Sequence, residues 1–576
     1  MQRGAIKVVL DGRGPLTLRD SDYVTSGGEG SIYRANSTIV KIYADKAKMV
    51  RDGMPDKIRL LADRLRHDNI VAPEGVVLGA GGDPVGFYMP FVDGEPLSRV
   101  FVTDYRARSG FGDNDARFLT DRMREVVRAA HGAKAVMVDA NELNWLVQFD
   151  KKSGAVPKVI DVDSWAISRW PATVVMPSIR DWNSKTFDAN SDWFCWGILA
   201  FQIFTGIHPF KGKVDGYRPG DMVQRMKDGA SVFDARARLP HSVRDFGCIP
   251  GPLLDWFRAE FQEGARTVPP SPFDKATPAK ASRVARVVTA GASGNIQYTK
   301  RFDRPCDDVV RVWPCGVALT NSGILFEIET AKAIMAGVPA SAEVVHFSPA
   351  AWVVADMEGG TPHFALVDRS QKQTMPFQMM AKRIFRAGNR LFAVTDRELL
   401  ELQIRVLGKP TITVSRRWVL QINATSWFDG VAVQDVLGSA FVFLPVDPAG
   451  AVQVKVPELD GLKVISAMAR GRFAAFVALD RNGAYQKIEL TFDKTHTAYT
   501  AWIGGTDSPD LNMAMLPTGV VATIATDGEL TLFVPANGAV NKIADRGVTT
   551  AMRLADIDSR LAYIHDGAVW QIRTST

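Results

Sequence analysis

The sequence predicts a multidomain protein in which an α+β domain is followed by an all-β domain, and three observations support this. A chain of 576 residues exceeds what one hydrophobic core can organise. Strand and helix periodicities alternate up to about residue 266, whereas helical periodicity is almost absent later. Residues 267–281 hold four prolines and few apolar side chains, as interdomain linkers do. We therefore expect domains at residues 1–266 and 285–576, joined by a linker at residues 267–284.

The first domain is expected to contain short strands and longer helices. Apolar runs at residues 39–43 and 86–90 have the length and β-branched content of strands. Apolar residues recur at helical spacing in residues 55–66, 116–131 and 191–205.

The composition is that of an ordinary globular protein, with 46% hydrophobic and 23% charged residues. The net charge is +6, but Lys and Arg are scattered among acids, which disfavours nucleic-acid binding. The longest uncharged run, residues 193–207, is shorter than the roughly 20 residues of a membrane span, so we expect a buried helix there and no membrane association.

Two further features favour a cytoplasmic location. Residues 1–10 lack the apolar stretch and cleavage site of a secretory signal. The cysteines are sparse and form no CxxC pair, so we expect reduced thiols rather than disulfides or a zinc site. These cysteines are Cys195, Cys248, Cys306 and Cys315.

A repeat of short apolar strands fills the second domain. Each copy has one apolar strand, a turn and a second alternating strand, and the copies are spaced by about 40 residues, as propeller blades are. Several turns carry the Gly with Asn or Asp that tight hairpins need, as in Asn482-Gly483, Asp527-Gly528 and Asp566-Gly567. The seven first strands begin near Val317, Val353, Phe392, Val431, Phe473, Val520 and Leu561.

The last repeat ends with its second strand, residues 568–573, and so lacks outer strands. Residues 294–300 precede the first complete repeat and can supply one, which would join the two ends of the domain and leave few exposed sheet edges. The pattern therefore predicts a seven-bladed β-propeller. Six or eight blades, or a β-sandwich array, stay open as alternatives.

A glycine-rich turn and a lysine mark an anion site in the first domain. Gly27, Gly28 and Gly30 stand within residues 24–33, where backbone amides can approach phosphate oxygens without interference from side chains. Lys41 follows at the centre of an apolar strand, where partial burial requires an anionic partner.

Two pairs of polar residues stand further along the chain. Asp139 and Asn144 stand five residues apart before an apolar strand. Asp161 and Asp163 end the next apolar strand.

Together with residues 191–210, these segments resemble the protein-kinase family, and the resemblance extends over residues 20–275. They are most similar to bacterial eukaryotic-like Ser/Thr kinases that carry a GGEG loop and have DVD in place of DFG. The resemblance implies a bilobal α+β domain that binds ATP and Mg²⁺. It implies that Lys41 contacts the α and β phosphates, and that the backbone of residues 87–95 reads the adenine edge. The implied nucleotide-binding residues are Val24, Gly27, Gly28, Gly30, Ile32, Lys41, Met89, Phe91 and Glu95, with Val24 and Ile32 against the adenine and Glu95 near the ribose.

The resemblance also implies catalytic roles. Asp139 would orient or deprotonate the substrate hydroxyl, and Asn141 stands where the family has a Lys near the γ-phosphate. Asp192 would support the catalytic loop from below. The implied metal ligands are Asn144, Asp161 and, as a second possible ligand, Asp163.

The chain also departs from the family pattern. Val138 replaces the Arg that precedes the catalytic Asp in many kinases, and Pro177-Ser178 is the nearest match to the APE sequence. The helix at residues 55–61 contains no Glu to pair with Lys41; Asp56 is the nearest acid, and it suits the start of a helix equally well.

We therefore expect a cytoplasmic, ATP- and Mg²⁺-dependent protein Ser/Thr kinase whose propeller recruits a protein substrate or partner. One alternative is a pseudokinase or assembly scaffold that uses both domains as docking surfaces. The other is a kinase-like fold that acts on a small molecule. Each domain is expected to fold on its own core.

Overall fold

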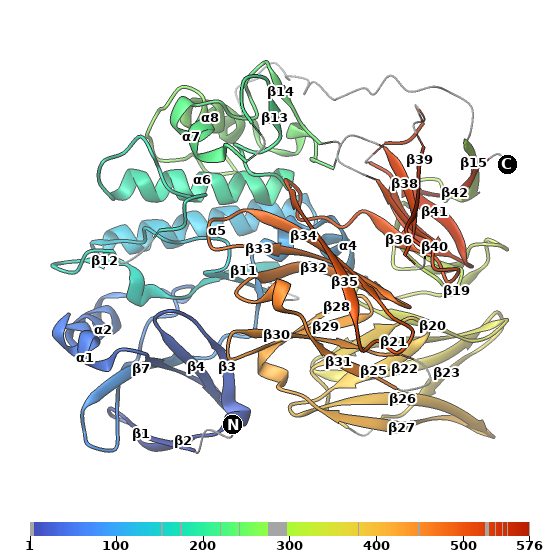
Figure 1. Ribbon diagram of the computed structural model, residues 1–576, viewed down its shortest axis with the longest axis horizontal. Helices are drawn as coiled ribbons and strands as arrows, with labels where there is room; N and C mark the ends of the chain where they lie inside the picture. Colours follow the sequence, from blue (N-terminus) through green and yellow to red (C-terminus); the bar gives the residue numbers. More distant parts are fainter. Residues whose placement is uncertain are drawn as a thin grey trace.

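The computed structural model describes residues 5–574 apart from 151–153, 173–174, 219, 241, 275–295, 378, 447–449, 525–528, 536, 544, 546 and 550. The described chain is multidomain and mostly β (Figure 1). Residues 275–284 of the expected linker lie outside the described residues. The described part, residues 267–274, packs on the first domain, where Thr267 accepts a hydrogen bond from Trp256 and Phe273 contacts Phe118.

The N-terminal domain begins with a seven-stranded antiparallel sheet in the order β2-β1-β6-β7-β5-β4-β3. Two helices, α1 (Lys46–Arg51) and α2 (Met54–Arg64), connect β5 to β6. The expected strands and helix are confirmed as β5, β7 and α2. The strands are β1 (Ile6–Leu10), β2 (Gly14–Leu18), β3 (Tyr23–Ser26), β4 (Gly30–Ala35), β5 (Thr38–Tyr43), β6 (Gly75–Leu78) and β7 (Pro84–Pro90).

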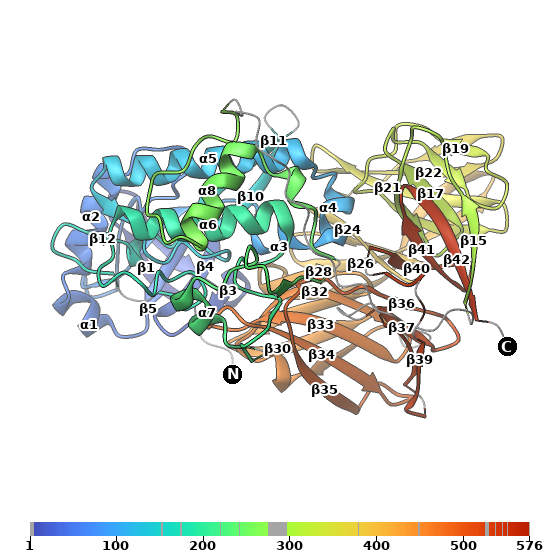
Figure 2. The same cartoon turned by 90° about the horizontal axis from the view of Figure 1, so that it is seen from above.

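The rest of this domain is mainly helical with short strands, and α5 (Asp113–Gly132), α6 (Ala189–Thr205) and α8 (Gly251–Phe261) contribute many residues to its largest apolar core. In Figure 1, α8 lies above α6 and α6 lies above α5, and Figure 2 shows that α5 and α6 run in nearly the same direction. Every residue of α6 from Ser191 on is buried, which confirms the expected buried helix. The other elements are α3 (Ser98–Phe101), α4 (Thr103–Ser109), α7 (Met222–Asp228), β8 (Glu95–Pro96), β9 (Ala135–Val136), β10 (Trp145–Asp150), β11 (Gly154–Val159), β12 (Ala166–Ile167), β13 (Lys213–Val214) and β14 (Ala237–Arg238).

Among the described helices, none combines the length and the apolar character that crossing a membrane requires.

The described part of the C-terminal domain forms seven four-stranded antiparallel sheets. All seven strands expected from the repeat are present, each as the second strand of its sheet. The Asn482-Gly483 and Asp566-Gly567 turns join β33 to β34 and β41 to β42, whereas Asp527-Gly528 lies outside the described residues. The first four sheets are β16 (Val309–Trp313), β17 (Val317–Thr320), β18 (Leu325–Glu327), β19 (Ala333–Met335); β20 (Glu343–Ser348), β21 (Ala351–Glu358), β22 (Thr361–Asp368), β23 (Lys372–Met375); β24 (Arg383–Ala387), β25 (Arg390–Val394), β26 (Glu398–Leu407), β27 (Lys409–Val419); and β28 (Thr425–Phe428), β29 (Val431–Val436), β30 (Ser439–Leu444), β31 (Val452–Lys455).

The remaining sheets are β32 (Lys463–Arg470), β33 (Phe473–Leu479), β34 (Tyr485–Phe492), β35 (Tyr499–Thr506); β36 (Met513–Met515), β37 (Val521–Ile524), β38 (Leu530–Val534), β39 (Ala539–Ile543); and β40 (Arg553–Ile557), β41 (Arg560–His565), β42 (Ala568–Thr574), β15 (Ile296–Phe302). The last of these sheets joins both ends of the domain, because β15 pairs with β42 in antiparallel register. The expected outer strand from residues 294–300 is therefore present as β15.

Consecutive sheets pack against each other, and β40 of the last sheet also contacts β16 of the first. The order of contacts therefore closes on itself, an arrangement compatible with a seven-bladed propeller.

The two domains pack closely together. Helices α3 and α4 of the N-terminal domain lie against β32 and β16, the first strands of two sheets. Val102, between these helices, belongs to one buried apolar cluster with Ile465, Leu479 and Tyr485 of the C-terminal domain. Apolar burial thus contributes to domain docking in addition to the polar contacts described below.

Candidate functional site

Lys41 lies in the middle of β5 and is only 6% exposed. Its strand pairs with β4 on one side and β7 on the other. A Cβ at Gly86 of β7 would overlap the carbonyl oxygen of Lys41, and one at Gly30 of β4 would overlap that of Ile42. These two glycines let the three strands close around the lysine. Gly30 therefore has a packing role in addition to its place in the glycine-rich turn.

Three carboxylates surround the Lys41 ammonium. Its Nζ lies 2.7 Å from Asp163 Oδ2, 3.2 Å from Asp161 Oδ1 and 3.0 Å from Glu29 Oε2. The two aspartates follow β11, and Asp161 has a left-handed backbone with φ 59° and ψ 35°. A non-glycine residue in this region is uncommon and often marks a functional site. Of the predicted site residues, the structure brings Lys41, Asp161 and Asp163 into direct contact.

Burial and mutual charge separate the pKa values of this cluster. Burial alone would lower the pKa of Lys41, but Asp163 and Asp161 outweigh it and raise that pKa well above its ordinary value. Burial alone would raise the pKa of Asp163, but Lys41 holds that pKa below its ordinary value. Burial and the neighbouring Asp163 charge raise the pKa of Asp161 to about 6. The Lys41–Asp163 pair is therefore ionised at neutral pH.

Asp163 is held by two residues that the sequence analysis did not select. The Tyr43 hydroxyl donates to Asp163 Oδ2 at 2.6 Å, and the Lys57 ammonium donates to the Asp163 backbone carbonyl at 2.6 Å. Lys57 is 1% exposed and comes from α2. Burial lowers the pKa of Lys57 to about 8.

Asp56 does not replace the expected glutamate. Its carboxylate lies on the exposed side of α2, where it pairs with Arg59 at 3.3 Å and Arg169 at 3.7 Å. The second of the two interpretations of Asp56, a residue at a helix start, therefore holds. The inward-facing residue of this turn is Lys57, and Glu29 of the glycine-rich turn provides Lys41 with its third carboxylate.

The loop before β10 has a rigid support. Asp192 at the start of α6 accepts hydrogen bonds from the backbone amides of Met137 and Val138 at 2.8 and 2.9 Å, and it contacts His131 Nε2 at 2.9 Å. The structural role expected for Asp192 is confirmed. Val138 has φ 59°, which is costly for a β-branched residue and which the Asp192 contacts stabilise.

Asp139 is held at the tip of this loop. Its Oδ1 accepts the Met176 amide at 2.8 Å, and its Oδ2 accepts the Asn141 side-chain amide at 3.2 Å. Burial raises the pKa of Asp139. The Asn144 side chain donates to the Asp139 carbonyl at 2.8 Å, and the Ile160 amide donates to the Asn144 carbonyl at 2.9 Å. Asp139, Asn141 and Asn144 thus form one network, which the Ile160 bond joins to the chain just before Asp161.

The glycine-rich turn is open over part of its length. Gly27 and Gly28 are exposed, and a Cβ at either would meet no atom within 4 Å. The Gly27 amide donates to the Gly30 carbonyl at 2.9 Å. Val24 and Ile32 are half-buried on the flanking strands β3 and β4. The turn therefore has free space above two of its three predicted glycines.

The segment after β7 turns toward the C-terminal domain. Met89 is buried, and the Phe91 amide already donates to the Ser37 carbonyl at 2.8 Å. The Glu95 carboxylate pairs with Arg383 of β24 at 2.5 Å. Burial alone would raise the pKa of Glu95, but the two arginines at positions 383 and 99 lower it to about 2. Glu95 is thus part of the domain interface and has no contact with the Lys41 cluster.

The C-terminal domain also touches the elements around the cluster. The Thr25 hydroxyl of β3 donates to Asp435, near the end of β29, at 3.2 Å. Lys211 donates to the Gly483 carbonyl at 3.3 Å, and a Cβ at Gly483 would overlap Ser178. The β33–β34 hairpin therefore covers the segment that holds Asp139 through Met176.

The three residues that the sequence analysis missed have different sequence signals. Glu29 is the acid within the GGEG turn. Lys57 lies on the apolar stripe of its helix, one position before Ile58 and four before Leu61, where a charged residue is unusual. Tyr43 gives no signal, because aromatic residues are common in strands.

Neither a comparison with protein-family models nor a search of curated proteins gave a match.

Proposed function

We propose that the N-terminal domain transfers the γ-phosphoryl group of ATP, with Mg²⁺, to a Ser or Thr hydroxyl of a protein. The observation that carries this proposal is the buried Lys41 held against Asp161 and Asp163, beside the Asp139 network and below an open glycine turn. Phosphoryl transfer depends mainly on positioning and charge stabilisation, and these residues provide both.

The acidic residues fit a divalent cation. One ligand oxygen from each of Glu29, Asp161 and Asp163 lies within 4.8 Å of the others. Asp163 Oδ1 is buried and has no hydrogen-bond partner, so a cation would satisfy it. Asp161, Asp163 and Asn144 would hold Mg²⁺, and the cation would neutralise charge on the phosphate oxygens of the nucleotide.

The protein's own residues divide the remaining tasks. Lys41 stays protonated, and its ammonium would bind phosphate oxygens of the nucleotide. Asp139 is fixed through Met176 and Asn141, so it can orient the acceptor hydroxyl and accept its proton. Gly27 and Gly28 leave their backbone accessible to phosphate oxygens.

The propeller-like domain supports recognition of a protein. It contacts the N-terminal domain at three residues, Thr25, Glu95 and Ser178. An acceptor protein that reaches Asp139 therefore has to pass or displace the β33–β34 hairpin. We infer that this domain selects or admits the substrate.

The test is transfer from labelled ATP, with Mg²⁺, by the purified full chain to itself or to a generic protein acceptor. Asp161→Asn and Lys41→Met should each reduce transfer by about 100-fold or more, because each removes a charge that stabilises the transition state. Asp56→Asn is the matched control, since Asp56 is exposed and lies outside the cluster. Full activity of either cluster variant would contradict the proposal.

A second candidate function is a nucleotide-binding scaffold without transfer. It is favoured by the basic Lys57 where a partner acid for Lys41 was expected, and by the hairpin that covers the Asp139 segment. Saturable ATP binding by the wild-type chain, lost in Lys41→Met and accompanied by no phosphate transfer under any condition, would support this candidate instead.

A further inference from the structure

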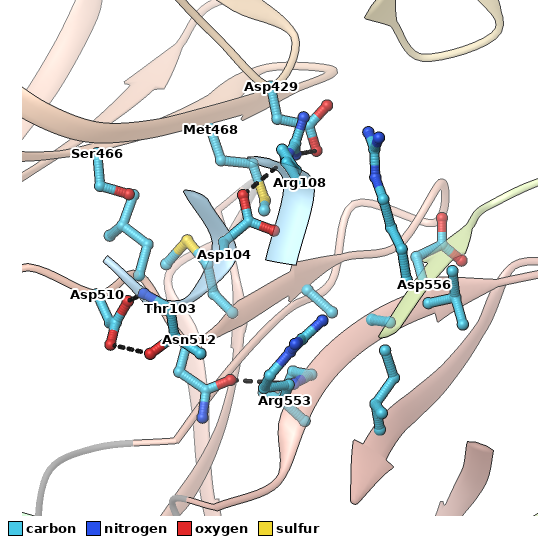
Figure 3. Close-up of a pocket in the computed structure, with 18 of the residues that line it drawn as sticks. Thr103, Asp104, Arg108, Asp429, Ser466, Met468, Asp510, Asn512, Arg553 and Asp556 are labelled. Atoms are coloured by element: carbon cyan, nitrogen blue, oxygen red, sulfur yellow. Dashed lines mark hydrogen bonds and ion pairs between the residues drawn. The ribbon is translucent and has the colours of Figure 1, made fainter. Parts of the chain in front are cut away.

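A cavity of about 380 Å³ lies between the first strands of the sheets and helix α4 of the N-terminal domain (Figure 3). In the close-up, Asp104 and Arg108 of α4 lie on one side and Arg553 on the other. The volume is within the range of small-molecule sites, which is about 300–1,000 Å³. Residues that line it include Asp104, Arg108, Met468, Asp510, Met513 and Arg553.

Most charged residues around this cavity satisfy each other. Arg108 pairs with Asp104 at 2.8 Å, and Arg386 pairs with Asp429 at 2.7 Å. Asp510 accepts the Thr103 amide at 2.6 Å and the Thr103 hydroxyl at 2.8 Å. Further ion pairs join Arg311 to Glu343 and Arg470 to Asp556.

Arg553 has fewer described partners than the other arginines that line this cavity: its Nη2 donates to the Val310 carbonyl at 3.1 Å, and no described carboxylate forms an ion pair with it. Arg244 also forms no ion pair with a described carboxylate, but it donates to the backbone carbonyls of three residues. A guanidinium has five N–H donors, so Arg553 can bind a further acceptor. Arginine binds carboxylate and phosphate oxygens in a two-pronged geometry.

Apolar side chains also line the cavity that contains Arg553. Met468, Met513 and Leu554 line the same cavity, and Met513 is buried. Thioether and alkyl side chains adapt to an apolar group of irregular shape. The cavity thus combines an arginine that forms no ion pair with a described carboxylate, Arg553, with an apolar wall, the composition expected of a site for an amphipathic ligand.

We propose that this cavity binds a small organic anion whose carboxylate or phosphate pairs with Arg553 and whose apolar part lies against Met468 and Met513. The proposal goes beyond phosphoryl transfer and does not depend on it. Because α4 forms one wall, the bound anion contacts both domains and stabilises their docking.

The test measures the melting temperature of the full chain with phenylacetate, phenyl phosphate, inorganic phosphate and the neutral phenylacetamide, each at millimolar concentration. Phenylacetate or phenyl phosphate should raise the melting temperature of the wild-type chain by a few degrees, while phenylacetamide should not, because it carries no charge for Arg553. A larger shift with phenyl phosphate than with phenylacetate would identify a phosphate ester as the preferred class. Inorganic phosphate alone should act weakly, since it does not use the apolar wall.

Three variants locate the effect. Arg553→Met should abolish the anion-induced shift, and Arg405→Met, on the exposed part of β26, should keep it. Ala551→Leu adds volume at an exposed residue of the cavity wall, so it should also abolish the shift while leaving the melting temperature without ligand unchanged. The proposal is overturned if neither aromatic anion shifts the wild-type protein, or if the shift persists in Arg553→Met and Ala551→Leu.

Discussion

At the scale of residues, the candidate site is organised around Asp163. This aspartate binds Lys41 from the sheet, Tyr43 from the same strand and, through its carbonyl, Lys57 from α2. Breaking one partner of such a buried pair leaves an uncompensated charge, which is costly. The arrangement therefore connects three elements through one side chain and its backbone, and it does so without an acid on α2.

His208 permits a pH-dependent prediction. The Phe210 amide donates to His208 Nδ1 at 3.1 Å, so the proton is on Nε2, which donates to the Ser178 carbonyl at 2.8 Å. Burial, with the Lys211 and Arg225 cations, lowers the pKa of His208 from 6.5 to about 3. The folded protein thus keeps this ring neutral, whereas the unfolded chain takes up a proton below pH 6.5. His208 therefore causes stability to be lost as the pH falls from 6.5 towards 3.

Between pH 7.5 and pH 5, His208 alone is expected to lower the free energy of unfolding by about 2 kcal/mol. Urea unfolding at both pH values should show that His208→Gln loses less stability on acidification than the wild-type chain. His346→Gln, at an exposed histidine, is the control and should follow the wild type. An equal pH dependence in His208→Gln would contradict this account.

At the scale of elements, local sequence patterns predicted individual helices, strands and turns, but they did not predict contacts between residues that are distant in the sequence. The Asn482-Gly483 turn and the alternation around it specify a hairpin by themselves, and β15 was expected because the last sheet lacked an outer strand. The apolar spacing of α5 and α6 gave their positions within a few residues. By contrast, the partners of Lys41 come from residues 29, 161 and 163, and no local pattern states which acid faces a given lysine.

The hairpin between β33 and β34 supports a second prediction. A Cβ at Gly483 would overlap the Ser178 hydroxyl, so Gly483→Ala should lift the hairpin from residues 176–179. Hydrogen exchange in those residues should become faster by about tenfold or more, as local opening becomes easier.

Gly438→Ala is the matched control. Gly483 has φ +79° and Gly438 has φ +82°, so both substitutions introduce the same backbone strain, but a Cβ at Gly438 meets no atom within 4 Å. Unchanged exchange at residues 176–179 in both variants would mean that the hairpin does not hold this segment. An equal increase in both would assign the effect to backbone strain.

At the scale of the whole molecule, the two domains differ in secondary structure, and non-covalent contacts join them in addition to the covalent connection. Glu95 pairs with Arg383, Arg99 donates to the Ile465 carbonyl at 2.6 Å, and Val102 enters an apolar cluster of the C-terminal domain. The described chain before the proline-rich segment contains both helices and strands, whereas strands predominate after it. The sequence did not predict this interface. The residues that form it lie far apart in the sequence, and no local pattern distinguishes them from other residues.

The interface leads to the last prediction. A specific protease site inserted after residue 280 should allow the chain to be cut, and we expect the two halves to remain together in size-exclusion chromatography at micromolar concentration. Buried apolar contacts and partly buried ion pairs both oppose separation, and added salt weakens only the ion pairs. The halves should therefore still elute together in 0.5 M salt.

Val102→Asp places an unpaired charge in the shared apolar cluster and should cause the halves to separate, whereas Val50→Asp, at an exposed valine of α1, should not. Separate elution of the unmodified halves at low salt would show that the domains associate only through their covalent connection, and that the contacts at Glu95 and Val102 contribute little to docking.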